Sequence, residues 1–217
     1  MDGVTHIYTL LSAPWCAWTM LCLLLFAFLA ELFQPGIVTQ SLSFVFARGD
    51  RVYKDAPANF PGLLFISLFR LGVLSMALCL CFCTLNHAPF AAFWVVAGLI
   101  FVVALVKMGI NALLDYTFLL SRRFGAAHEA YSSLITVSTV VLYPVLLVLL
   151  HCDNAAAAVW TLGLMAAFFI GVWAYRCVRT YLVSPAALIY LPLYIATMEV
   201  LPLLALFYLS DKMIAFL

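Results

Sequence analysis

Apolar and polar positions divide the chain into six long apolar runs separated by short polar connections. Each run holds about the 20 apolar residues that a helix needs to cross the hydrocarbon core of a bilayer. The runs are apolar throughout and do not alternate at every second residue, which favours helices over the strands of a membrane barrel. We therefore expect six membrane-spanning helices, over residues 14–33, 61–84, 88–106, 131–150, 155–175 and 185–209.

Two further segments mix polar and apolar residues in the manner of helices at the membrane surface. The first, residues 38–48, combines threonine, glutamine and serine with valine and phenylalanine. In the second, residues 107–123, polar residues recur at helical spacings of four, four and seven, at Lys107, Asn111, Asp115 and Arg122. This narrow polar stripe suits a helix at the headgroup boundary. It equally suits a continuation of the third span into the cytoplasm, and the pattern does not separate the two.

Composition confirms the membrane class and excludes others. Of the 217 residues, 68 % are hydrophobic and 9 % are charged, against about 45–50 % and roughly 25 % in soluble domains. A chain this short cannot hide so much apolar surface from water. A net charge of +1 without a long basic run argues against nucleic acid as a partner. No linker or repeat interrupts the chain, so residues 1–217 are expected to form a single all-α membrane domain in contact with the lipid bilayer.

Lysine and arginine positions orient the spans, because basic residues collect in cytoplasmic loops. Eight of the ten fall in connections on one side of the membrane, at 48–54, 107–123 and 176–179, whereas the opposite side has Lys212 alone. We therefore expect both termini outside the cytoplasm. The first six residues hold no lysine or arginine, which favours a retained first span over a secretory signal peptide.

Arg70 and Glu199 are ionisable residues inside two of the expected spans. An ionised side chain near the bilayer centre costs about 2.5–3.5 kcal/mol on insertion scales, so such residues face the protein interior, pair, or mark a pathway. One interpretation is a proton or ion relay that uses both residues. The alternative is a structural ion pair or a hydrogen-bonded tether between two helices.

Prolines interrupt two of the expected spans, at Pro144 in the fourth and at Pro192 and Pro202 in the sixth. Each removes a backbone donor and frees the carbonyl four residues earlier. Ordinary kinks that let helices pack are the favoured interpretation. The alternative is a broken helix beside Glu199, as occurs in transporter sites.

Small residues recur every four positions on the fifth span, at Gly163, Ala167 and Gly171. This spacing lets helix backbones approach closely in a membrane. The pattern predicts either an internal packing face or a contact with a partner subunit, and it favours neither.

No pattern predicts a metal, a cofactor or a catalytic group. Cys79, Cys81 and Cys83 are two residues apart, so they point to different faces of a helix. His128-Glu129 lacks the second histidine of a zinc-protease motif. A disulfide between Cys83 and Cys152, both expected near the outer face, stays open.

Four stretches resemble an uncharacterised family of polytopic inner-membrane proteins from Bacteroidota, a family of unknown function. They are residues 51–60, residues 107–118, Tyr143-Pro144 and residues 190–204. The last stretch carries Tyr194 and the sequence Glu199-Val200-Leu201-Pro202, with Ala196 where the family usually has cysteine. The resemblance implies six spans in the inner membrane and no activity.

Three hypotheses for function follow. Short loops, the absence of a catalytic constellation and the small-residue spacing favour a non-catalytic accessory or scaffold subunit of a larger inner-membrane assembly, in protein export or envelope biogenesis. Arg70, Glu199 and the prolines favour a small transporter or proton-coupled carrier instead. The third hypothesis is an intramembrane lipid-modifying enzyme, in which basic loops hold a phosphate headgroup.

Overall fold

A computed structural model describes residues 14–46, 59–86, 90–118, 121–151, 155–181 and 201–215. This part of the chain is helical and contains no strand, which confirms the all-α prediction. Its seven helices are α2 (Pro14–Phe33), α3 (Ile37–Phe46), α4 (Phe60–Asn86), α5 (Phe90–Phe118), α6 (Ser121–His151), α7 (Ala155–Tyr181) and α9 (Leu201–Ala215).

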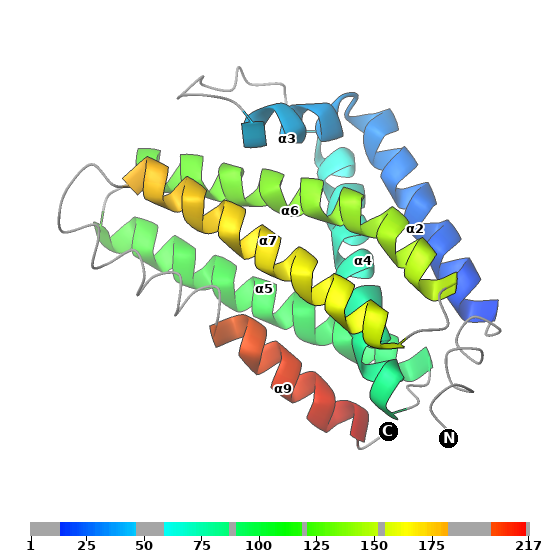
Figure 1. The fold of residues 1–217 in the computed structure, drawn as a ribbon. Helices are drawn as coiled ribbons and strands as arrows, with labels where there is room; N and C mark the ends of the chain where they lie inside the picture. The colour runs from blue at the N-terminus through cyan, green and yellow to red at the C-terminus, as the bar shows by residue number, and fades with distance from the viewer. Residues whose placement is uncertain are drawn as a thin grey trace.

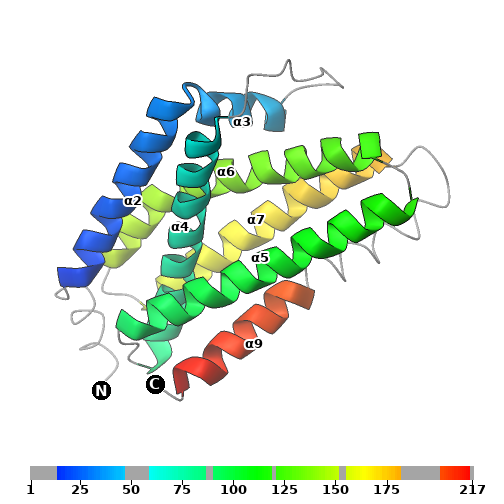
Figure 2. The same ribbon diagram turned by 180° about the vertical axis from the view of Figure 1, so that it is seen from behind.

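Helix α4 is the centre of the bundle. It contacts α2, α5, α6, α7 and α9, and half of its apolar window is buried, against 22 % for the windows of α2 and α5. The six long helices alternate in direction, so the first residue of α2 and the last residue of α9 lie at the same end of the bundle (Figures 1 and 2).

Four helices are long and apolar enough to cross a membrane: Trp15–Phe33, Phe60–Cys81, Phe90–Ile110 and Tyr131–Leu150. They match the first four expected spans. A shorter apolar stretch, Val159–Tyr175, lies on α7 where the fifth is expected. The structure describes the expected sixth span only from residue 201 onward, as the start of α9. Large apolar side chains on the outer faces are exposed, as at Phe28, Trp94 and Phe168, which suits a surface that faces lipid.

Helix α3 is the helix expected within residues 38–48, and it packs against α6. It crosses the ends of α2 and α4 (Figure 1). The turn before it depends on Gly36, whose φ of 81° favours glycine. The backbone N–H of Gly36 donates to Glu31 Oε1 at 2.6 Å, which fixes the turn.

The expected segment 107–123 does not form a separate surface helix. Helix α5 continues from the third span through Phe118, and α6 already begins at Ser121. No proline stands between Val106 and Phe118, so nothing in the sequence stops the helix there. Of the polar stripe, Lys107, Asn111 and Asp115 lie on α5 and Arg122 lies on α6, so the four do not share one helix.

The core lies where α4 packs against its neighbours, around the fully buried Ile66, Phe69 and Val73. Two glycines of α4 make room for α2 and for the residue that follows it. A Cβ atom added at Gly62 would lie 2.8 Å from Cβ of Gln34, the residue after α2, and one added at Gly72 would collide with the Leu23 side chain on α2.

Candidate functional site

Arg70 lies on the central helix, at its contact with α6. It is the one charged residue in the apolar window Phe60–Cys81 and follows the buried Phe69. The guanidinium Nη1 donates to Ser132 Oγ at 3.0 Å, and Nη2 donates to Thr136 Oγ1. Arg70 thus joins α4 to α6 through two hydroxyl groups.

The geometry at Thr136 suits this contact. Its hydroxyl donates to the backbone carbonyl of Ser132 at 2.9 Å, which leaves the oxygen lone pairs to accept from Arg70. Thr136 is fully buried, so water does not compete for this hydroxyl. Arg70 Nε is also buried but has no hydrogen-bond partner among the described residues.

The two hydroxyls belong to a polar face of α6 that faces the bundle. Ser132, Thr136, Thr139 and Tyr143 are spaced by four, three and four, which places them on one side of a helix. Thr139 is buried and donates to the carbonyl of Ile135 at 2.9 Å. Tyr143 Oη donates to the carbonyl of Met20 on α2 at 3.0 Å. The sequence interpretation missed this face, although the spacing alone contains the signal.

No described carboxylate pairs with Arg70. Glu31 is the one acidic side chain that the structure describes, and it binds Gly36 at the turn before α3. Glu199 and Pro192 lie outside the described residues. The described contacts of Arg70 are hydrogen bonds between α4 and α6, and both the relay and the pairing with Glu199 stay predictions.

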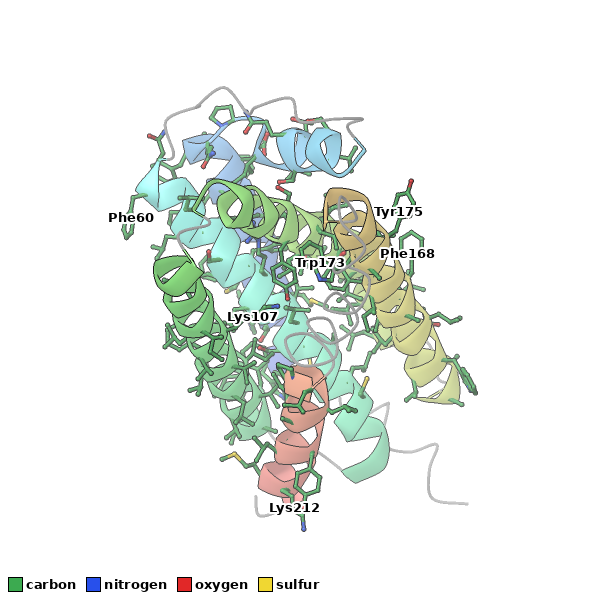
Figure 3. All side chains as sticks on the ribbon, turned by 90° about the vertical axis from the view of Figure 1, so that its left-hand side faces the viewer. Phe60, Lys107, Phe168, Trp173, Tyr175 and Lys212 are labelled. Atoms are coloured by element: carbon green, nitrogen blue, oxygen red, sulfur yellow. The ribbon has the colours of Figure 1, made fainter. Side chains whose placement is uncertain are left out.

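Lys107 reaches the same part of α6 from α5. Its Nζ lies 3.7 Å from the centroid of the Tyr131 ring, a cation–π contact. The Tyr131 ring in turn makes a T-shaped contact with the Trp173 ring on α7, with centroids 4.9 Å apart. Figure 3, seen from the end where α6 begins, places Lys107 and Trp173 inside the bundle, whereas Phe168 and Tyr175 point outward. The side chains of Asn111, Asp115 and Arg122 are outside the described set.

The prolines that the structure describes occupy different settings. Pro144 lies inside α6, which continues to His151. Pro202 lies on α9, next to residues that the structure does not describe. The kinks expected at these positions stay predictions.

The small residues of α7 do not pack inside the described bundle. Gly163, Ala167 and Gly171 are exposed, and a Cβ atom added at either glycine would meet nothing within 4 Å. The described residues show no internal packing at these glycines, and the contact with a partner subunit stays a prediction.

The cysteine patterns add no metal site. No group of three or more metal-ligating side chains occurs within the ranges that the structure describes. The side chains of Cys83 and Cys152, between which the sequence leaves a disulfide open, both lie outside the described set.

Comparison with known proteins identifies the family. No curated protein and no solved structure matches the chain. A family described as Domain of unknown function (DUF4271) matches residues 16–209, which is nearly the whole chain and extends the resemblance toward the N-terminus. The four helices that are long and apolar enough to cross a membrane indicate a membrane protein, and the chain belongs to the family described as Domain of unknown function (DUF4271).

Proposed function

We propose that this protein is a non-catalytic accessory or scaffold subunit of a larger assembly in a bacterial inner membrane, in protein export or envelope biogenesis. In this proposal the chain crosses the membrane six times with both termini outside the cytoplasm. The alternating direction of the long helices supports six crossings. The basic residues in the connections support the orientation.

The exposed face of α7 is the observation that carries the proposal. Gly163, Ala167 and Gly171 form a shallow strip, and the exposed Trp160 and Phe168 stand beside it. In lipid, helices associate through close packing at small residues, because lipid tails are as apolar as the side chains. A strip that no described helix of this chain covers therefore suits a helix of another subunit.

A pull-down tests the proposal. The tagged protein, expressed at its native level and extracted in mild detergent, is expected to retain inner-membrane proteins in a fixed ratio. Gly163→Leu is expected to release them. Gly98→Leu on α5 is the matched control, because Gly98 is also exposed with nothing within 4 Å but lies outside the strip. Recovery of the wild type alone, or equal losses for both variants, contradicts the proposal.

Reporter fusions test the proposed orientation. Alkaline phosphatase is active outside the cytoplasm, so a fusion after Leu217 is expected to be active and a fusion after Arg123 inactive. Fluorescent-protein fusions at the same positions are expected to give the opposite pattern. An active fusion after Arg123 overturns the orientation.

A second candidate function is a small transporter or proton-coupled carrier. The observation that favours it is Arg70, a cation on the central helix with a buried Nε and no carboxylate partner among the described residues. Glu199 would supply the missing negative charge. Glu199→Gln keeps the side-chain shape and removes the charge, so it is expected to abolish function in a depletion–rescue assay if the carrier hypothesis holds. Full rescue by Glu199→Gln removes its main support.

A further inference from the structure

Three of the five tryptophans of the chain are exposed near the first residues of three helices. Trp18 on α2, Trp94 on α5 and Trp160 on α7 are 67 %, 62 % and 73 % exposed. Trp18 and Trp94 each lie four residues after the first residue of their helix, and Trp160 lies five residues after the first residue of α7. The three indoles therefore occupy nearly the same register on their helices.

The three helices that carry these tryptophans run in the same direction. The first residues of α2, α5 and α7 lie at one end of the bundle (Figures 1 and 2). At this end the ring of Trp15 on α2 packs against the ring of Phe90, the first residue of α5, with centroids 5.3 Å apart. Because the directions agree, an equal register on each helix means a similar depth along the bundle.

An exposed indole combines an apolar ring with an N–H group that only donates a hydrogen bond. The hydrocarbon core of a bilayer accepts the ring but offers no acceptor for the N–H. The headgroup level offers both acyl chains and lipid oxygens, and tryptophan is enriched there. The apolar stretches of the three helices begin at Trp15, Phe90 and Val159. Each exposed tryptophan thus lies at the edge of an apolar stretch, where this level is expected.

A lysine at the same end of the bundle adds charge complementarity to a lipid headgroup. Helix α9 runs opposite to α2, so its last residues lie at the end where α2 begins (Figure 2). Lys212 is exposed three residues before the last residue of α9, beside the exposed ring of Tyr208 (Figure 3). An ammonium group at this level attracts the phosphate of a headgroup while the lysine stem stays among acyl chains.

We propose that Trp18, Trp94 and Trp160 contact the headgroup level of one leaflet of a phospholipid bilayer, where lipid oxygens accept from the indole N–H groups. Three points on three helices define a plane, so these contacts fix both the depth and the tilt of the bundle in the membrane. The contacts are independent of the partner surface proposed on α7, because they form between the chain and lipid alone.

Fluorine NMR of the full chain labelled with fluorotryptophan tests the depth of each indole. The purified protein is reconstituted in phosphatidylcholine nanodiscs that contain a phospholipid with a nitroxide either at the headgroup or near the end of an acyl chain. A nitroxide broadens the signals of nearby fluorine nuclei. The signals of Trp18, Trp94 and Trp160 are expected to lose more intensity with the headgroup nitroxide, in similar proportion. Single tryptophan-to-phenylalanine variants serve only to assign the signals, so the depths are measured on the wild type.

Two positions on the same helices are the controls. Trp173 on α7 is 4 % exposed, so its signal is expected to lose the least intensity with either nitroxide. Phe28→Trp adds an indole on α2 at a position that is 64 % exposed. It lies ten residues after Trp18, about 15 Å further along the helix, which is near the centre of a hydrocarbon core about 30 Å thick. Its signal is expected to respond more to the nitroxide at the chain end.

Other patterns overturn the proposal. Different responses of Trp18, Trp94 and Trp160 to the two nitroxides would show that the three indoles do not lie at one level. A stronger response of all three to the chain-end nitroxide would place them in the hydrocarbon core. A response as small as that of Trp173 would show that lipid does not reach them. Equal responses of Trp18 and of the indole in Phe28→Trp would show that α2 does not cross the membrane. Since no partner subunit is present, each outcome is separate from the outcome of the pull-down.

Discussion

Replacing Thr136 by valine tests whether the hydroxyl contact between α4 and α6 stabilises the fold. Valine keeps nearly the same shape and removes the oxygen that accepts from Arg70 Nη2. Thr136 is fully buried, so water cannot take the place of the lost acceptor. The guanidinium is left with its bond to Ser132 and two unsatisfied nitrogens, Nε and Nη2.

The magnitude follows from the kind of bond that is lost. A hydrogen bond to a charged group contributes about 1.5–3 kcal/mol in soluble proteins. Between membrane helices the measured contribution averages about 0.6 kcal/mol and reaches about 1.7 kcal/mol. Because this bond is charge-assisted and buried, we expect the upper part of the membrane range, about 1.5 kcal/mol of unfolding free energy.

The assay is equilibrium unfolding of the full chain in mixed micelles with increasing sodium dodecyl sulfate. Thr161→Val is the matched control, because the Thr161 hydroxyl donates only to the carbonyl of Ala157 on its own helix. The unfolding free energy lost in Thr161→Val measures the contribution of such a local bond, which Thr136 also makes to the carbonyl of Ser132. A double-mutant cycle with Arg70→Met then isolates the contact between helices, and we expect a coupling of about 1 kcal/mol. Equal destabilisation by Thr136→Val and Thr161→Val, together with an additive cycle, would refute the tether.

Two further stability predictions use the same assay. Gly62→Ala is expected to lower the unfolding free energy by about 1–3 kcal/mol, because the new Cβ would lie 2.8 Å from Gln34 Cβ, an atom that cannot rotate away. Gly163→Ala meets open space and is expected to be neutral or slightly stabilising, so a loss as large as that of Gly62→Ala contradicts the packing argument. Tyr143→Phe is expected to cost about 1 kcal/mol, since it removes the bond to the carbonyl of Met20; no change would show that this bond contributes nothing.

The existence of the helices could be predicted because the bilayer leaves few alternatives. Backbone groups in hydrocarbon must bond within their own segment, so each long apolar run becomes a helix. The same argument says little about where a helix ends. Residues 107–118 carry polar side chains, but nothing in them breaks a helix, and α5 continues through them. Hydropathy locates the edge of the membrane, whereas backbone geometry locates the end of the helix.

The partners of Arg70 could not be predicted from charge alone. The sequence places one cation, Arg70, and one carboxylate, Glu199, well inside expected spans, whereas Glu31 lies near the end of the first span, and this suggests Glu199 as the partner. The described partners are instead two hydroxyls that lie 62 and 66 residues further along the chain. The spacing of Ser132, Thr136 and Tyr143 contains the signal of a polar face, but the sequence analysis considered charged residues and did not use the spacing of hydroxyl groups.

The spacing of glycines likewise does not predict where two helices approach closely. The repeat at Gly163 and Gly171 satisfies the rule for close helix approach, yet both positions are open within the described bundle. Gly62 and Gly72 belong to no such repeat, yet a Cβ atom added at Gly72 would collide with Leu23 on α2, and one added at Gly62 would collide with Gln34, which directly follows α2. Close approach depends on which face of a helix meets a neighbour, and the spacing of small residues does not contain that information.

A neutral hydroxyl contact has a different consequence from an ion pair. Ser132 and Thr136 fix the position of the Arg70 guanidinium without cancelling its charge. None of the described residues balances this charge, so its partner is to be sought among the acidic residues outside them, and Glu199 of the expected sixth span is the candidate. An ion pair couples the two residues energetically, whereas two independent residues do not. A double-mutant cycle of Arg70→Met and Glu199→Gln, measured as unfolding free energy, is therefore expected to show a coupling of about 1 kcal/mol if Glu199 is the partner, and additive losses would leave the two hydroxyls as the contacts that hold Arg70.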